Sequence, residues 1–138
     1  KKDQEALLKA VENGVVDCIS SHHMPQDWDG KTIEFENAKP GIASIETCYA
    51  AVQQMLPNLS TEKIAQLFSK NARQIFNLPT IEIKEGGIAE FTLFNNTGTT
   101  KLSASHSKSK SANSPFWDLP LKGKVIGTIV KNKLHINV

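Results

Sequence analysis

The sequence predicts an α/β protein that holds only part of a parallel sheet and continues into a smaller β-rich region. Apolar residues recur at three- and four-residue steps in several stretches of the first 79 residues, as in helices that cover a core. One run among them, 15–20, is almost continuously apolar and β-branched, which is typical of a strand covered on both faces. After Pro79 the pattern changes to alternating strands and glycine turns. Because one parallel strand cannot complete a sheet, we expect the chain to begin within a larger fold.

The first region is expected to be mostly helical. Its predicted elements are, in order, a helix at 3–13, a strand at 15–20, a long polar segment at 21–41, a helix at 45–56 and a further helix from 61 onward. Gly14 suits the left-handed residue after the first helix, Pro57 stops the second, and Ser60 or Thr61 caps the third. A connection as long as 21–41 inside a compact domain is usually functional or mobile.

The second region, 80–138, is expected to form a small β-domain separate from 1–79. Its predicted strands are 81–84 and 89–94 about a Gly86–Gly87 turn, and 125–130 and 134–138 as a hairpin whose loop is 131–133. Asn132 in that loop tolerates a left-handed conformation. Composition alone makes the Ser- and Lys-rich segment 97–116 a flexible linker.

Composition and charge argue against several kinds of partner. The 138 residues include 16 basic and 14 acidic side chains, so this near balance gives no reason to expect nucleic acid. No run approaches the about 18 apolar residues of a transmembrane helix, so we expect no membrane span. Cys18 and Cys48 form no CxxC pair, which favours reduced, buried thiols in a cytoplasmic protein.

Several stretches resemble one family in order and spacing. GVVDCISSHHMPQ (14–26) and FENAKPGIASIET (35–47) resemble the last barrel strand and substrate loop of dihydroorotases, which belong to the metal-dependent amidohydrolase superfamily. Three later stretches resemble the family's following helix, its β-segment and its tail: SKNARQIFNLP, IEIKEGGIAEFTLF and SKSANSPFWDLPLKGKVIGTIVKNKL. The resemblance implies the C-terminal part of a TIM-type (β/α)8 barrel, followed by part of a small β-sandwich domain. It also makes the Ser- and Lys-rich segment a family loop rather than an arbitrary linker.

The resemblance implies a reaction as well as a fold. Dihydroorotases interconvert dihydroorotate and carbamoyl aspartate in pyrimidine biosynthesis and hold zinc, which lowers the pKa of bound water. The family's zinc ligands come largely from strands that would precede this chain, so we expect no zinc on this chain alone. A Pro-Gly pair whose backbone contacts substrate in the family matches Pro40 and Gly41.

The adjacent histidines fall on the family's last-strand motif. That motif reads Asp-His-Ala-Pro-His, and here the same register reads HHMPQ at 22–26. His22 takes the position of the aspartate that moves a proton, and Gln26 that of a histidine that helps to hold the substrate carboxylate. His23 matches the pattern and is the third candidate side chain. A neutral imidazole at position 22 brings neither the charge nor the second oxygen of a carboxylate.

Three interpretations of His22 stay open: a degraded and inactive site, a rewired but active one, and an ordinary loop histidine. His106 and His135 have no zinc-ligand spacing to the pair, so we expect surface roles for them. Two functions compete accordingly. One is an amidohydrolase acting on dihydroorotate, and the other is an inactive homologue that serves as a scaffold for aspartate transcarbamoylase. Uncovered strand edges further predict self-association into a homo-oligomer.

Overall fold

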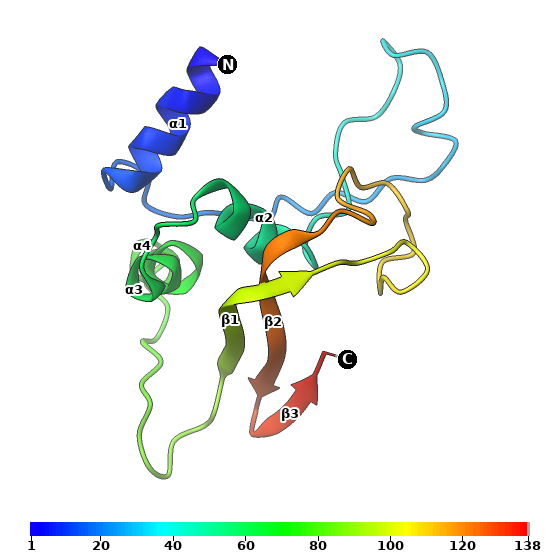
Figure 1. Cartoon of the computed structure of the whole chain (residues 1–138). Coiled ribbons are helices and arrows are strands. Elements are labelled where there is room, and N and C mark those ends of the chain that lie inside the picture. Colours follow the sequence, from blue (N-terminus) through cyan, green and yellow to red (C-terminus); the bar gives the residue numbers. More distant parts are fainter. Residues whose placement is uncertain (138) are drawn as a thin grey trace. The chain divides into compact units, whose positions relative to one another are not determined.

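The computed structural model describes residues 1–137 (Figure 1). The chain folds into two compact units, each assembled from separate stretches. Unit 1 comprises Lys1–Ser20, Met55–Asn95 and the residues from Val125 onward, and unit 2 comprises Ser21–Gln54 and Asn96–Lys124. Each unit therefore takes residues from both sides of Pro79, and the division into domains at 1–79 and 80–138 stays a prediction.

The first predicted helix is present as α1, Lys2–Glu12. Val11 is its buried residue, and Asn13 follows as the C-cap. Gly14 then adopts a left-handed φ of +76°, a conformation that costs glycine little and ends the helix as the sequence predicted.

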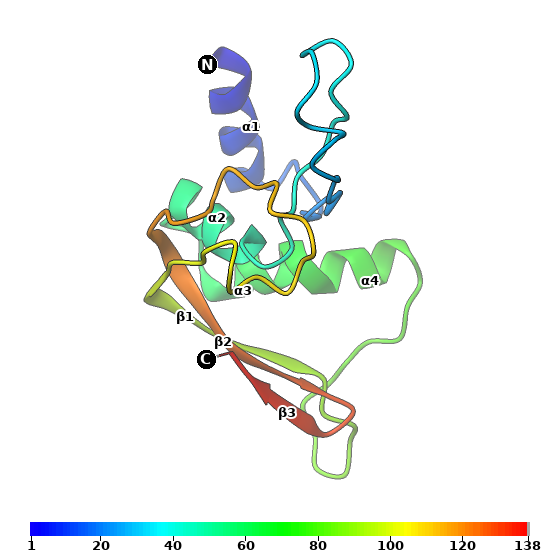
Figure 2. The ribbon, with the colours of Figure 1, turned by 90° about the vertical axis from the view of Figure 1, so that its right-hand side faces the viewer.

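The third predicted helix is one continuous helical segment of unit 1, visible in green in Figure 2. It consists of α3 (Thr61–Ala65), a π-helical turn η1 (Gln66–Lys70) and α4 (Asn71–Ile75). The Ser60 side chain accepts a hydrogen bond from the backbone N–H of Lys63 at 3.2 Å, so it caps the helix start. Ile64 and Leu67 are its buried residues, and Leu67 is 0% exposed.

The predicted strand at Val15–Ser20 is wrong, because this segment is not a strand in the structure. Its hydrogen bonds go to helices: the Val15 N–H donates to the Ala10 carbonyl of α1 at 2.9 Å, and the Ile19 N–H donates to the Leu67 carbonyl at 2.9 Å. The Asn71 amide similarly donates to the Asp17 carbonyl at 2.7 Å. A strand needs a neighbour to complete its hydrogen-bond ladder, and none of β1–β3, the strands of the described residues, pairs with it.

The sheet has three strands in the order β1-β2-β3, with β2 in the middle (Figure 1). They are β1 (Phe91–Thr100), β2 (Leu121–Val130) and β3 (Lys133–Ile136). β2 and β3 pair antiparallel, with Val130 opposite Lys133 and Gly127 opposite Ile136. Lys131 and Asn132 form the turn with φ values of +47° and +64°, the signature of a type I′ hairpin turn.

The predicted hairpin is therefore confirmed, with a two-residue loop in place of three. Of the predicted last strand, Val138 lies outside the described residues. The predicted strand at 81–84 is wrong, and the strand predicted at 89–94 begins at Phe91 and runs on to Thr100, inside the segment first taken for a linker. The turn at Gly86–Gly87 does form, since the Gly87 N–H donates to the Lys84 carbonyl at 3.1 Å, but no ladder extends from it.

Unit 2 contains α2 (Cys48–Met55) up to Gln54, and this helix is shorter than the predicted 45–56. The buried residues of unit 2 include Ala43, Thr47, Ala50 and Gln53. Residues 27–40 form a long connection without helix or strand, drawn in blue to cyan in Figure 1, as the polar composition predicted. No helix within residues 1–137 combines the length and apolar character needed to cross a bilayer.

Candidate functional site

The turn that carries the two histidines lies in unit 2 beside the segment after the long connection. His23 forms an isolated parallel bridge with Ile42, and the Met24 N–H donates to the Ile42 carbonyl at 3.0 Å. This single bridge aligns the turn at 22–26 with residues 40–44. The structure thus brings together the two segments that contain all five predicted site residues.

His22 is exposed and has a φ of +45°. Residues other than glycine seldom adopt this left-handed region, and they do so mostly in turns and at functional positions. The turn therefore directs consecutive side chains differently from a regular strand, and His22 and His23 have different surroundings.

His23 is half-buried and its ring is held by backbone groups. Its Nδ1 accepts hydrogen bonds from the backbone N–H groups of Ser44 at 3.1 Å and Ile45 at 3.2 Å. A ring nitrogen that accepts two N–H groups carries no proton, so in the neutral ring the proton sits on Nε2. The Ser44 hydroxyl donates to the Ser21 carbonyl at 2.7 Å, which ties the same two segments together again.

Gln26 and the Pro40–Gly41 pair are in direct contact. The Gln26 amide nitrogen donates to the Pro40 carbonyl at 3.1 Å. Gly41 has a φ of +110°, and a Cβ at this position would lie 2.6 Å from the Met24 backbone oxygen. The close approach of the two segments therefore requires glycine at position 41.

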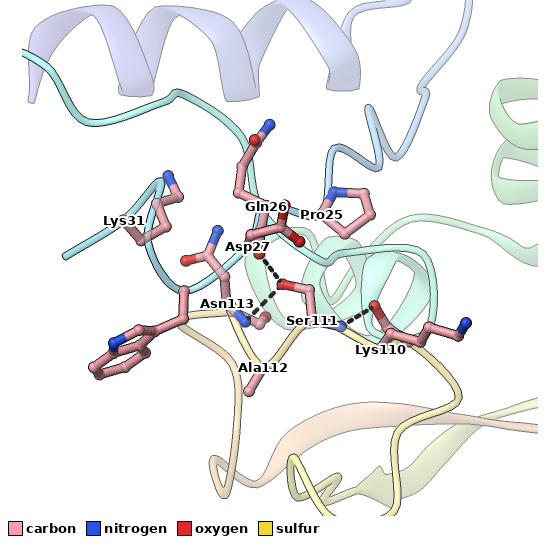
Figure 3. Close-up of a pocket in the computed structure, with 11 residues that line it drawn as sticks. Pro25, Gln26, Asp27, Lys31, Lys110, Ser111, Ala112 and Asn113 are labelled. Atoms are coloured by element: carbon pink, nitrogen blue, oxygen red, sulfur yellow. Dashed lines mark hydrogen bonds between the residues drawn. The ribbon is translucent and has the colours of Figure 1, made fainter. Parts of the chain in front are cut away.

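A pocket of about 570 Å³ adjoins the turn (Figure 3). One wall consists of Pro25–Trp28 and Lys31, and the other of Ser109–Ser114. The Ser111 hydroxyl joins the two walls, because it donates to the Gln26 carbonyl at 2.7 Å. Of the predicted site residues, only Gln26 lines this pocket.

Segment 107–113 belongs to the site, although the residue-level sequence reasoning did not assign it there. The Asn113 amide donates to the Gly41 carbonyl at 2.8 Å, and the Asn113 carbonyl accepts the Ala43 N–H at 2.7 Å. The serines at 107, 109 and 111 form a ladder in which each hydroxyl accepts the backbone N–H two residues on, at 3.0–3.2 Å. The alternation of serine and lysine in SKSKS was the signal, since a hydroxyl two residues back can satisfy a backbone N–H outside regular structure.

Glu46 anchors the start of this segment. Its carboxylate accepts a hydrogen bond from the Ser107 hydroxyl and one from the Lys108 N–H at 3.0 Å. Partial burial would raise the pKa of the Glu46 carboxyl. The hydrogen bonds from Ser107 and from the backbone of Lys108 and Ser109, with the Lys108 charge, outweigh it and leave the pKa below its ordinary value. Sequence reasoning missed Glu46 because its partners lie about sixty positions later.

The remaining candidates are not gathered at this site. His106 lies in a turn of the Ser- and Lys-rich segment, where its Nδ1 is 2.6 Å from the Ser103 hydroxyl, and His135 is exposed on β3. Cys18 and Cys48 are free thiols, and burial raises the pKa of Cys48. Within residues 1–137 no three His, Cys, Asp or Glu side chains come together as a metal site would need, so these residues do not by themselves fit zinc.

Comparison with known proteins relates the chain to one group of enzymes. It is 32% identical over 137 residues to the dihydroorotase of Aquifex aeolicus and 38% identical over 138 residues to the dihydroorotase-like protein of Pseudomonas aeruginosa. In both cases 97% of this chain is covered, and it spans about a third of the relative's length, 32%. No family model matches the chain.

Solved structures of hydantoinases and dihydropyrimidinases contain a region with the same fold as this chain. The dihydropyrimidinase of Brevibacillus agri superposes with a TM-score of 0.81 at 20% identity, and the D-hydantoinase of a Thermus species with a TM-score of 0.80 at 19%. Each match covers 96% of this chain and 31% of the solved one. At such identities the likeness concerns the fold.

Proposed function

We propose that this chain belongs to the dihydroorotase family of amidohydrolases and is the C-terminal part of a dihydroorotase-like cyclic amidohydrolase that has lost its activity. In this proposal its first region completes a TIM-type (β/α)8 barrel and its second contributes to a small β-sandwich domain. The whole protein is cytoplasmic and homo-oligomeric, and its substrate pair is dihydroorotate and carbamoyl aspartate. The observation that carries the proposal is the similarity over 97% of the chain.

The location of the turn supports a site at this place. In barrels of this type, active sites lie at the carboxyl ends of the strands. The turn at 22–26 follows the segment that resembles the last barrel strand, and it contacts Pro40 through the Gln26 amide and Ile42 through the His23 bridge. His23, Gln26, Pro40 and Gly41 are the proposed substrate-facing residues.

Two side chains support the loss of activity. His22 takes the aspartate position, and a neutral imidazole supplies no carboxylate to carry a proton from the attacking water to the leaving nitrogen. Gln26 takes the position of a substrate-holding histidine, and a neutral amide gives a carboxylate a weaker contact than a charged donor does. The Gln26 amide nitrogen is moreover engaged by the Pro40 carbonyl at 3.1 Å.

In this proposal zinc would be held mainly by residues in other parts of the complete protein. When bound in such enzymes it activates water for attack on the cyclic amide. His23 has its Nδ1 occupied by two backbone N–H groups, so in the neutral ring Nε2 carries the proton and could donate a hydrogen bond to a ligand but has no lone pair for a metal. One histidine nitrogen does not make a zinc site, so the ligands have to come from elsewhere, and we expect no zinc on this chain alone.

A second function has support in the same two positions. A homologue without its acid can be retained as a scaffold, and the partner we propose is aspartate transcarbamoylase. The presence of His22 and Gln26 in place of the family's aspartate and histidine favours this alternative. Both site side chains differ from the family's, while Pro40 and Gly41 match it. The relative at 38% identity is itself described as dihydroorotase-like.

The test is a paired restoration in the complete protein, His22→Asp with Gln26→His. A proton-transferring group typically contributes about 10²- to 10⁴-fold, so the restored variant is expected to hydrolyse dihydroorotate at least about 100-fold faster than the parent. A parent that already matches the restored variant would show that His22 has taken over the aspartate's role. If neither turns over substrate, the loss extends beyond these positions, and co-purification with aspartate transcarbamoylase decides for or against the scaffold.

A further inference from the structure

The candidate site keeps its shape without regular secondary structure. The turn at 22–26 and the loop at 40–44 share one isolated bridge and hydrogen bonds that involve the His23, Ser44 and Gln26 side chains, without a regular ladder between them. Segment 107–113 adds three further hydrogen bonds to them. These are Ser111 to Gln26 at 2.7 Å, Asn113 to Gly41 at 2.8 Å, and Ala43 to Asn113 at 2.7 Å.

Segment 107–113 is itself irregular, so something must hold it. Its serine ladder satisfies backbone N–H groups from within, and two of the ladder hydroxyls still donate outward. The Ser107 hydroxyl donates to the Glu46 carboxylate, and the Ser111 hydroxyl donates to the Gln26 carbonyl. Glu46 therefore holds one end of the segment, and the site turn lies at the other.

We propose that Glu46 is a positioning residue of the candidate site, acting through segment 107–113 on Gln26 and Gly41. Its carboxylate accepts both the Ser107 hydroxyl and the Lys108 N–H, and charge-assisted bonds of this kind are stronger than neutral ones. Releasing them frees the start of the ladder. Ser111 and Asn113 then lose the positions from which they reach the Gln26 and Gly41 carbonyls, and the pocket wall formed by Ser109–Ser114 moves away from Pro25–Trp28.

The proposal deepens the proposed function, since it names what holds the turn that we assign to substrate. It is tested without an activity assay, by hydrogen exchange of single amides of these residues in the complete protein. The decisive amide is that of Ala43, which donates to the Asn113 carbonyl and makes no contact with Glu46 in the hydrogen-bond network described above. In Glu46→Ala, both the Lys108 and the Ala43 amides are expected to exchange roughly 10-fold faster or more, from the loss of charge-assisted bonds.

Three comparisons keep the test specific. The Ile19 amide in unit 1 and the Ala51 amide in unit 2, bonded to the Leu67 and Thr47 carbonyls, are expected to keep their exchange rates and so report that both units stay folded. Glu46→Gln restores an acceptor oxygen without the charge and is expected to recover part of the Ala43 protection. Ser105→Ala changes a nearby serine that bonds within its own turn, and it should leave Ala43 unchanged.

NMR chemical shifts report whether the residues of the site change their surroundings. In Glu46→Ala and in the milder Ser107→Ala, shifts are expected to change at Gln26 and Gly41 as well as in segment 107–113. Faster exchange at Lys108 with Ala43, Gln26 and Gly41 unaltered would overturn the proposal, because Glu46 would then hold only its own neighbours. Loss of Ile19 or Ala51 protection in Glu46→Ala leaves Ser107→Ala as the deciding variant, judged by the same criterion. Neither outcome depends on whether dihydroorotate is turned over.

Discussion

The β2–β3 hairpin is held by backbone pairing, whereas segment 107–113 is held by side chains. In the hairpin, Gly127 to Val130 pair with Lys133 to Ile136 in regular register, so the identity of most side chains matters little to the pairing. In segment 107–113 the hydroxyls of alternate serines and the Asn113 amide make the bonds. The part of the molecule nearest the candidate site therefore depends on particular side chains, whereas the hairpin depends on a turn.

The largest expected effect is at Gly41. Gly41→Ala would place a Cβ 2.6 Å from the Met24 Cβ and backbone oxygen at a φ of +110°, so we expect the free energy of unfolding to fall by about 2 kcal/mol or more. Urea unfolding of the two proteins measures it. Gly86→Ala is the matched control, because its φ is +74° and no atom lies within 4 Å of the added Cβ. An equal loss at both positions would show that close packing at Gly41 contributes nothing.

A smaller effect is expected at Asn113. Asn113→Ala removes the amide that donates to the Gly41 carbonyl at 2.8 Å, and a hydrogen bond of this kind contributes about 1 kcal/mol. The backbone bond from Ala43 to residue 113 remains, so the fold is expected to persist with a looser loop at 40–44. Thermal unfolding measures the change, with the exposed Asn58→Ala as control. Identical stability of the two variants contradicts the assignment of Asn113 to the side-chain-held region.

Acidification is expected to loosen segment 107–113 and not the hairpin. The pKa of Glu46 is below the ordinary 4.5, so its stabilising contribution is fully present above pH 4.5 and is lost as the pH falls through the lowered value. The Lys108 charge is one of the causes that lower the Glu46 pKa. Amide shifts of 107–109 followed by NMR down to acidic pH should show this titration. Glu46→Gln should lack it, and a titration that survives in that variant would assign the change to another group.

The smallest expected effect lies in the hairpin turn. Lys131 has a φ of +47°, which a lysine adopts at some cost, and glycine relieves it. Lys131→Gly is therefore expected to raise the free energy of unfolding by less than about 1 kcal/mol, or to leave it unchanged where the entropy of the unfolded chain offsets the gain. Lys133→Gly, at the first residue of β3, should lower it instead. A marked loss of stability on Lys131→Gly would mean that this side chain, and not the turn, holds the hairpin.

The helices and the hairpin could be predicted from the sequence because their causes are local. Gly14 ends α1, Ser60 caps α3, and Asn132 accepts a left-handed turn, each through residues within a few positions. The strand at Val15–Ser20 was wrong for the opposite reason. An apolar, β-branched run needs a neighbouring strand to pair with, and in this structure its hydrogen bonds go to α1 and to the helix around Leu67.

The same distinction applies to the candidate site. The sequence by itself determined which residues resemble a known turn and loop, including His22, His23 and Gln26, because their order along the chain carries that information. Only the tertiary structure brought segment 107–113 to them and Glu46 to its serine ladder, through bonds that join residues 61 to 85 positions apart. Spacing along the chain cannot reveal such contacts. A serine or an asparagine can bond to many different groups, and only folding determines which of them comes within about 3 Å.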